Sequence, residues 1–295
     1  MSGSSGLQRG IYVFHCAHDG SGNVYYSYFD GQSWGSDTLV QNMQTNAGVA
    51  PVYFNGQIYC FHGGFTNSSL YCNMFDGTNW SGDTPVSNTN MSFTPAGMVY
   101  KGSIYVFHHG EDQNGQLWYN VTDGQGNWAG DVQVPDMELW QGPSAVVVND
   151  QVWCFHQGHD NGPDNKLWVN TLSSDGSWQG DQQVPNVGMS ESPAAILSGG
   201  NVAVFHQGDD NDEQLWYSLF VPGRGWQADQ QIQDVELVNG PGVCLFNKRL
   251  FCFHQGSSGQ NELWCTTRLG YAWTSDVQLT DAWLWYSPGV IAVQG

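Results

Sequence analysis

Two short motifs recur six times in phase along the chain, and this repetition restricts the fold more than any other feature. A Phe-His pair recurs at intervals of 47, 46, 48, 50 and 48 residues, its histidines being His15, His62, His108, His156, His206 and His254. A tryptophan followed three residues later by an aspartate keeps the same period, at Trp34, Trp80, Trp128, Trp178, Trp226 and Trp273. Such a repeat indicates an array of similar units, each of which buries its core against its neighbours.

Each repeat is interpreted as four short strands. Residues 192–232 contain four strand-like runs of five to eight residues, separated by segments rich in glycine, asparagine and aspartate. This pattern predicts a four-stranded antiparallel meander, and four strands per repeat around an axis are typical of a β-propeller. A 3.6-residue helical period is absent. The sequence therefore predicts an all-β fold, a six-bladed β-propeller of four-stranded antiparallel blades.

The two ends of the chain complement each other. Residues 11–20 resemble the second strand of a blade with no first strand before it, whereas residues 286–295 resemble a first strand with nothing after it. We predict that 286–295 is the innermost strand of the first blade, which closes the ring without an exposed sheet edge. Residues 1–10 are interpreted as a leader or a cloning remnant. The single domain, 11–295, has repeats near 11–41, 47–86, 92–135, 141–185, 190–232 and 238–279.

The charge balance excludes several classes of partner. Seven Lys and Arg residues oppose 27 Asp and Glu residues, which gives a net charge of −20. Seven basic residues do not supply the basic face that nucleic acid requires. The chain also lacks a run of 18 apolar residues and an apolar signal core. We expect a soluble protein without a nucleic-acid partner or membrane insertion, either cytoplasmic or released without a signal peptide.

The cysteines favour a reducing compartment. Their number is odd, seven, and Cys60, Cys154 and Cys252 occupy one repeat position just before Phe-His. Equivalent positions of separate blades should lie too far apart for a disulfide, which needs Cα atoms within roughly 7 Å. We predict buried, reduced thiols.

Two polar segments of each repeat should meet on one face of the ring. In an up-and-down meander, the loop between the second and third strands and the crossover to the next blade leave from the same face. Neighbouring blades should therefore frame a shallow cleft with a Trp floor and a polar rim, which suits a sugar because its C–H faces stack on aromatic rings. The predicted sugar-binding residues are His108, Trp118, Trp140, His156, Gln157, Trp168, Glu191, His206, Gln207, Asp209, Trp216, His254, Gln255, Trp264 and Trp285.

Structural roles compete with these assignments. A histidine of the Phe-His motif could bond the neighbouring loop instead of a ligand, and the tryptophans of the Leu-Trp pairs could pack between blades. The Asp-Gly turns and the Trp-x-x-Asp motif are assigned structural roles, as turn caps and interblade packing. Trp140 and Trp285 stand in crossovers that are rich in aromatic residues, and these should make two of the six clefts more apolar.

Neither a metal site nor a cofactor is predicted. The six histidines stand in separate blades, whereas a metal needs three or four converging ligands. The acidic loops 158–165 and 208–213 carry enough oxygen atoms for calcium, but their spacing differs from that of the twelve-residue calcium loop. Calcium binding at these two loops stays open.

The combination of VFHQG (204–208), LWY (215–217) and SESPAA (190–195) resembles the propeller lectins of the Photorhabdus lectin-like family and related mushroom lectins. The resemblance covers all six repeats. It implies sugar sites between blades, for L-fucose and O-methylated sugars or for terminal N-acetylglucosamine. Blades 3 to 6 keep the pattern, whereas blades 1 and 2 have Tyr25 and Tyr71 in place of the tryptophan. We therefore expect about four functional clefts.

These features predict a multivalent, non-enzymatic lectin for the glycans of glycoproteins or glycolipids, in which several weak sites act together. A protein-interaction propeller without sugar binding is the alternative. A six-bladed sialidase would need clustered arginines and paired carboxylates, but the arginines stand at different repeat positions: Arg9, Arg224, Arg249 and Arg268. The exact sugar and the oligomeric state are left open.

Overall fold

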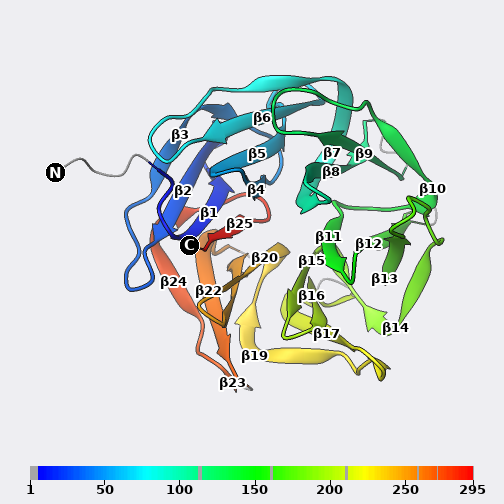
Figure 1. Cartoon of the computed structure of the whole chain (residues 1–295). Helices are drawn as coiled ribbons and strands as arrows, with labels where there is room; N and C mark the ends of the chain where they lie inside the picture. Colours follow the sequence, from blue (N-terminus) through cyan, green and yellow to red (C-terminus); the bar gives the residue numbers. More distant parts are fainter. Residues whose placement is uncertain are drawn as a thin grey trace.

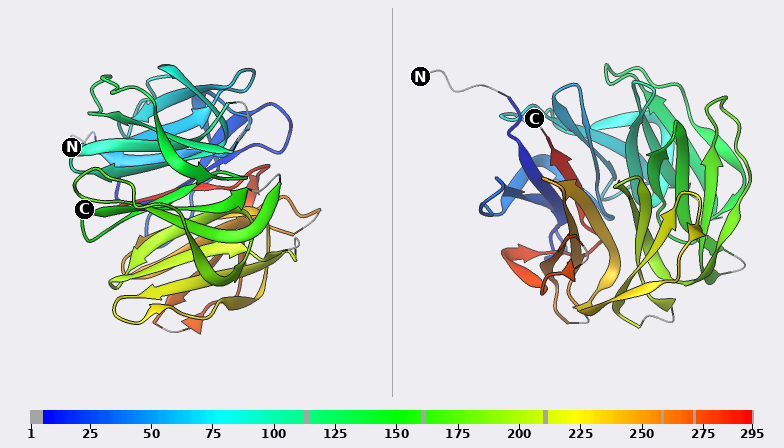
Figure 2. Two further views of the ribbon diagram at one scale, coloured as in Figure 1. Left: turned by 90° about the vertical axis from the view of Figure 1, so that its right-hand side faces the viewer. Right: turned by 60° about the horizontal axis from the view of Figure 1, so that its bottom comes forward.

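The computed structural model describes residues 6–111, 115–159, 162–209, 212–257, 259–270 and 272–294. The described residues form a closed ring of six β-sheet blades, which Figure 1 shows along the ring axis. Figure 2 shows the same ring edge-on and tilted, with the blades following one another around it. The prediction of an all-β, six-bladed propeller is confirmed.

Every blade has four main strands, ordered from the axis outward. Blade 1 contains β25 (Gly289–Val293), β1 (Gly10–Cys16), β2 (Asn23–Phe29) and β3 (Thr38–Gln44). Blade 2 contains β4 (Ala50–Phe54), β5 (Gln57–Gly63), β6 (Ser69–Phe75) and the first part of β7 (Thr84–Tyr100). Blade 3 contains the second part of β7, β8 (Ser103–Gly110), β9 (Gln116–Thr122) and β10 (Val132–Glu138). Because β7 pairs with both β6 and β8, blades 2 and 3 share one continuous sheet.

The other three blades repeat this order. Blade 4 contains β11 (Ser144–Val148), β12 (Gln151–His159), β13 (Pro163–Leu172) and β14 (Gln182–Gly188). Blade 5 contains β15 (Ser190–Ser198), β16 (Asn201–Gln207), β17 (Gln214–Val221) and β19 (Gln230–Glu236), with the short β18 (Gly225–Trp226) beside β17. Blade 6 contains β20 (Val238–Phe246), β21 (Arg249–Gln255), β22 (Glu262–Leu269) and β24 (Val277–Trp283), with the short β23 (Ala272–Trp273) beside β22.

The first and last strands of the chain close the ring. β25 pairs antiparallel with β1, from Gly10 opposite Val293 to Phe14 opposite Gly289, as predicted. The innermost strands contact one another in the circular order β25, β4, β7, β11, β15 and β20, and β20 contacts β25 again. Residues 1–5 of the predicted leader, and residue 295, lie outside the described residues, whereas Leu7 packs against the core between blades 1 and 2.

A ring of edge-to-face aromatic contacts joins each blade to the next. The phenylalanine of each Phe-His pair is fully buried and meets the indole of the following blade, with ring centroids 5.6–6.2 Å apart and planes at 83–89°. The pairs are Phe14–Trp80, Phe61–Trp128, Phe107–Trp178, Phe155–Trp226, Phe205–Trp273 and Phe253–Trp34. The predicted interblade packing of these tryptophans is confirmed.

The Asp-Gly turns are capped by their own aspartate side chains, as the sequence predicts. The aspartate of each Asp-Gly turn caps the turn: Asp30 Oδ1, for example, accepts hydrogen bonds from the backbone N–H groups of Gln32 and Ser33.

All seven cysteines are free, and six are buried. Burial raises the pKa of the Cys16 thiol to about 12, so this thiol is protonated at neutral pH. Among the described residues, no helix has the length and apolar character needed to cross a membrane.

Candidate functional site

Each histidine of a Phe-His pair is bonded to the aspartate of the Trp-x-x-Asp motif in the same blade. The shortest distances from histidine Nε2 to a carboxylate oxygen lie between 2.9 and 3.3 Å. The pairs are His15–Asp37, His62–Asp83, His108–Asp131, His156–Asp181, His206–Asp229 and His254–Asp276. The aspartate side chains keep 13–23% of their surface exposed, whereas the histidine side chains keep at most 1%. The two recurrent motifs of the sequence thus form one polar unit per blade.

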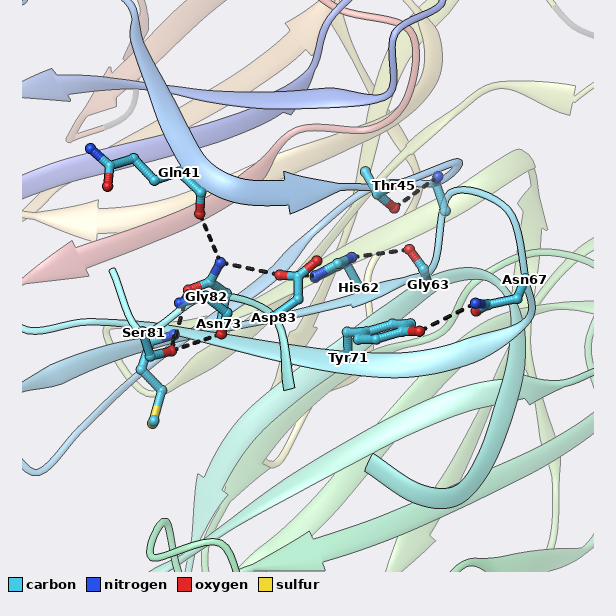
Figure 3. Close-up of polar contacts among 12 residues, drawn as sticks. Gln41, Thr45, His62, Gly63, Asn67, Tyr71, Asn73, Ser81, Gly82 and Asp83 are labelled. Atoms are coloured by element: carbon cyan, nitrogen blue, oxygen red, sulfur yellow. Dashed lines mark hydrogen bonds and ion pairs between the residues drawn. The ribbon is translucent and has the colours of Figure 1, made fainter. Parts of the chain in front are cut away.

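Figure 3 shows this unit in blade 2. His62 Nε2 lies 3.1 Å from Asp83 Oδ1, and His62 Nδ1 lies 3.0 Å from the carbonyl oxygen of Gly63. The Asn73 side chain donates to the same Asp83 oxygen and to the carbonyl oxygen of Gln41 in blade 1. Because the second bond crosses the interface, the polar unit also links neighbouring blades.

The assignment of four histidines as sugar contacts is corrected by this geometry. They are fully buried, and both ring nitrogens of each lie within hydrogen-bond distance of a protein oxygen, so the rings offer a ligand no free group: His108, His156, His206 and His254. The structural alternative, a histidine held by its own blade, is the one that the structure supports.

The three glutamines that follow these histidines are also structural. They are 2–4% exposed. The amide nitrogen of Gln157 donates to the carbonyl oxygen of Met189, and that of Gln207 donates to the carbonyl oxygen of Leu237. Gln255 instead donates to Asn261 Oδ1. These bonds hold the loops and crossovers in place, and their burial corrects the prediction that the glutamines contact a sugar directly.

An aromatic ring stands opposite every one of the six histidines on the third strand of its blade. The register pairs them across the two strands, and all six aromatic side chains are half-buried: Tyr25, Tyr71, Trp118, Trp168, Trp216 and Trp264. In blades 1 and 2 the tyrosine stacks on the imidazole, with centroids 6.1 and 5.8 Å apart. In blades 4 and 5 the indole N–H donates to an aspartate four residues earlier, Asp164 at the start of β13 and Asp212 before β17. In blades 1 and 2 the aromatic ring therefore covers the buried histidine, and in all six blades the aromatic side chain keeps part of its surface exposed.

Three cavities recur at one position of the repeat, each between two blades. We name them by the blades that form them: cleft 2/3 has a volume of about 350 Å³, cleft 5/6 about 810 Å³ and cleft 6/1 about 640 Å³. Each is lined by the aromatic residue of the third strand and by the aspartate that bonds the histidine; these are Trp118 and Asp131, Trp264 and Asp276, and Tyr25 and Asp37. A fourth cavity of about 390 Å³, lined by Asn42, Gln44 and Asp83, lies between blades 1 and 2.

The wall opposite the aromatic ring comes from the preceding blade. In blades 1 to 5 the outer strand contains a residue with positive φ, between 50° and 60°: Asn42, Asn88, Asp136, Asn186 and Asp234. Asn and Asp tolerate this conformation better than other residues with side chains. The register shifts at this point, as expected of a bulge, which bends the strand and re-aims its end. Two residues later, Asn90 lines cleft 2/3, Glu236 lines cleft 5/6 and Trp283 lines cleft 6/1.

Sequence reasoning missed both of these polar contributions. The aspartates of the Trp-x-x-Asp motif were assigned to structure alone, although they recur as regularly as the histidines and carry the exposed oxygen atoms of the clefts. The wall residues show no common residue type, so a repeat comparison could not single them out. Conversely, Trp118 and Trp264 were predicted for the site, and both line cavities.

The other predicted site residues do not line the three cavities, and they lie in different environments. Trp140 stacks on His159, with centroids 5.4 Å apart, and Trp285 stacks on His18 at 4.3 Å. Both tryptophans belong to crossovers; His159 ends β12 of the next blade, and His18 lies in the loop after β1. Asp209 is exposed and lies over Gly188, the residue that takes the wall position between blades 4 and 5. Trp168 and Trp216 occupy the floor position of blades 4 and 5.

Replacing Glu191 with glutamine is expected to stabilise the protein at neutral pH. Glu191 is half-buried at the start of β15, and burial raises the pKa of its carboxyl group because it disfavours the charged form. The penalty is absent below the unfolded-state pKa of about 4.3 and grows as the pH rises through the raised folded-state value. Urea midpoints of the wild type and Glu191→Gln should therefore coincide at low pH and separate as the pH rises to neutral.

Glu111→Gln provides a control of opposite sign. Glu111 is exposed and accepts hydrogen bonds from Ser68 and Asn90, which lower the pKa of its carboxyl group. Its small stabilising contribution is present above the unfolded-state value and is lost as the pH falls. A difference between wild type and Glu191→Gln that did not change with pH would contradict the burial argument.

Metal binding finds no support among the described side chains. In the part of the chain that the structure describes, no three His, Cys, Asp or Glu residues gather closely enough to hold a metal ion. The two acidic loops considered for calcium include residues 160, 161, 210 and 211, which lie outside the described residues.

Solved structures of fungal lectins share this fold. A triple arginine-to-alanine variant of AofleA from Arthrobotrys oligospora superposes with a TM-score of 0.69 at 12% identity, covering 91% of this chain and 82% of that one. The Aleuria aurantia lectin in complex with α-methyl-L-fucoside has a TM-score of 0.67 at 16% identity, covering 94% and 98%. Another structure of that lectin is described as a six-bladed β-propeller with a novel fucose recognition mode.

An enzyme with a similar fold is more distant. An α-L-arabinofuranosidase from Clostridium thermocellum has a TM-score of 0.56 at 15% identity, covering 80% of this chain and 95% of that one. Neither a protein-family model nor a curated protein matches this chain. At such low identities the structural likeness shows the propeller fold alone, and the resemblance to the Photorhabdus and mushroom lectins stays a prediction.

Proposed function

We propose that this protein is a multivalent carbohydrate-binding lectin whose sugar sites lie in the clefts between blades. One observation carries the proposal: an aromatic ring and a carboxylate line a cavity together at three separate blade interfaces. The aromatic ring suits the C–H face of a sugar, and the carboxylate suits its hydroxyl groups. Each shallow site would bind weakly, so useful affinity requires a surface that presents many copies of the glycan.

Fucosides are the first ligands to test, with terminal N-acetylglucosamine and O-methylated sugars after them. The structural neighbours include a lectin bound to α-methyl-L-fucoside. The four arginines of this chain do not recur at one repeat position, and none of them lines the three clefts. We therefore propose that carboxylates and amides, such as Asp276 and Gln260 in cleft 5/6, bind the sugar hydroxyl groups instead. A net charge of −20 favours neutral over anionic glycans.

The number of active clefts is a separate proposal. Motif retention predicts about four, in blades 3 to 6. Tyr25 nevertheless lines a cavity in cleft 6/1, so a tyrosine in the floor position does not close a cleft. We propose that cleft 6/1 is active, together with clefts 2/3 and 5/6.

A glycan array with labelled protein, with and without EDTA, tests the proposed function. Binding to fucosylated, methylated or N-acetylglucosamine-terminated glycans that EDTA does not change is the expected result. Silence across the array would favour the alternative, a protein-interaction propeller. Because a glycosidase shares the fold, release of nitrophenol from 4-nitrophenyl α-L-arabinofuranoside would overturn the non-enzymatic assignment.

The double variant Trp118→Ala/Trp264→Ala is expected to lose two sites. Stacking on an aromatic ring contributes about 0.5–1.5 kcal/mol, so binding at clefts 2/3 and 5/6 should weaken up to roughly tenfold. Isothermal titration with the best array ligand should then show fewer sites per chain. Tyr53→Ala, which removes an exposed ring from β4 outside the clefts, is the control. An unchanged stoichiometry in a folded double variant would contradict the floor assignment.

A further inference from the structure

We call wall position the place on the outer strand of a blade from which Asn90, Glu236 and Trp283 line the cleft to the next blade. At one interface this position is occupied by a large aromatic residue. Around the ring it is occupied by residues that are polar or small, until the last blade places a tryptophan there: Gln44, Asn90, Glu138, Gly188, Glu236 and Trp283. Trp283 is 50% exposed, and the nearby Trp285 is 47% exposed. Exposed indoles on a strongly acidic protein indicate that something apolar covers them.

Cleft 6/1 therefore has aromatic rings on both sides. Tyr25 lines it from blade 1, backed by the buried His15, and Trp283 lines it from β24 of blade 6. His18, which also lines the cleft, stacks on Trp285 with centroids 4.3 Å apart and planes at 22°. This stack ties the crossover from blade 6 to the loop of blade 1, as does the hydrogen bond from the backbone N–H of Trp285 to the carbonyl oxygen of Cys16. Tyr25 and Trp283 thus lie beside a segment in which two contacts connect blade 6 to blade 1.

The polar groups of cleft 6/1 are gathered on the blade 1 side. Asp37 is bonded to His15, and Ser36 and Asp19 line the cavity with it, all three from blade 1. Among the described side chains that line the cavity, blade 6 contributes Trp283 alone. In cleft 5/6 the preceding blade instead contributes Gln231, Gln233, Asp234 and Glu236. A ligand in cleft 6/1 thus meets hydrogen-bonding groups on one side and an aromatic face on the other.

We infer that cleft 6/1 binds a glycoside with an aromatic aglycone. This inference rests on the proposed function. The sugar would lie against Tyr25 and Asp37, and the aglycone would lie against Trp283. A second sugar at Trp283 would find no hydrogen-bonding partner among the described side chains of blade 6 that line the cavity, which is unfavourable. A flat aromatic group has no such need and gains about 0.5–1.5 kcal/mol from stacking on the indole. The cavity of about 640 Å³ falls within the range of pockets that hold drug-sized molecules.

Paired titrations with 4-nitrophenyl and methyl glycosides of L-fucose and of N-acetylglucosamine test this inference. With the sugar that binds, the nitrophenyl glycoside should show one site that is about 2- to 13-fold tighter than the others, the factor that corresponds to one stacking contact. Trp283→Ala should remove this tighter site and leave the affinity of the other clefts for the nitrophenyl glycoside unchanged. Glu236→Ala, at the same repeat position of cleft 5/6, should keep it.

The outcomes separate this inference from the proposed function. Equal affinities of nitrophenyl and methyl glycosides, or a tighter site that survives Trp283→Ala, would overturn the inference while the lectin assignment stands. If no methyl glycoside binds at any site, but a nitrophenyl glycoside binds one site that needs Trp283, the lectin assignment fails and the aromatic site stands. Titration with 4-nitrophenol alone measures what the aglycone contributes without a sugar. Since Trp283 is half exposed, thermal melting should show Trp283→Ala folded.

Discussion

Replacing Phe205 with alanine is expected to destabilise the propeller by about 3–5 kcal/mol, the cost of removing a buried aromatic side chain. Phe205 has no exposed surface, and its ring meets Trp273 of blade 6 edge-on with centroids 5.7 Å apart. Truncation would leave a cavity between two blades, which can collapse only if the ring deforms. Urea unfolding followed by tryptophan fluorescence measures the effect.

The control for this substitution is Leu197→Ala in the same blade. Leu197 is 39% exposed, so its truncation should change the free energy of unfolding by no more than about 0.5 kcal/mol. Phe253→Ala extends the test to the closure of the ring, because Phe253 contacts Trp34 of blade 1. If Phe205→Ala cost less than about 1 kcal/mol, these contacts would not be the main connection between blades.

Replacing Asp276 with asparagine is expected to abolish most ligand binding in cleft 5/6. The Asp276 carboxylate lines the cavity and is held by His254 Nε2 at 3.0 Å. Hydrogen bonds to a charged group contribute about 1.5–3 kcal/mol, so affinity at this cleft should fall by roughly 10- to 150-fold. Titration should then show one site fewer than the wild type, with the remaining sites unchanged.

Two further variants separate charge from position in this cleft. Asp175→Asn removes a carboxylate that caps a turn outside the clefts, and it should leave the number of sites unchanged. His254→Ala removes the group that positions Asp276 without touching the ligand. It should weaken the same site, and it should also lower stability by about 1–3 kcal/mol because a partly buried carboxylate loses its partner. Full binding by folded Asp276→Asn protein would remove the aspartates from the proposed site.

The architecture was predictable because it depends on local, repeated signals. The spacing of His15, His62 and their equivalents set the number of blades, and the match between residues 286–295 and the first strand of a blade predicted the pairing of β25 with β1. Strand alternation and turn residues act over a few residues only, so the same local preferences recur in each of the six repeats.

The roles of individual polar residues were less predictable. Gln207 stands in the same motif as His206 and looks equally available for a ligand, yet both are buried. Whether a polar side chain meets solvent depends on its neighbours on the next strand, and the register places Trp216 opposite His206. The wall of each cleft depends on the neighbouring blade and on a bulge in its outer strand.

The sequence by itself thus determined the repeat, the strands, the blade count and the closure of the ring, because each follows from short-range patterning. Only the tertiary structure decided that the histidines are buried and hold the aspartates, that three of these aspartates line the named clefts, and that Trp283 forms one wall of the cleft that Tyr25 also lines. The physical reason is that every cleft joins residues of two different blades. Their contact is set by blade packing and strand bending, which no single repeat encodes.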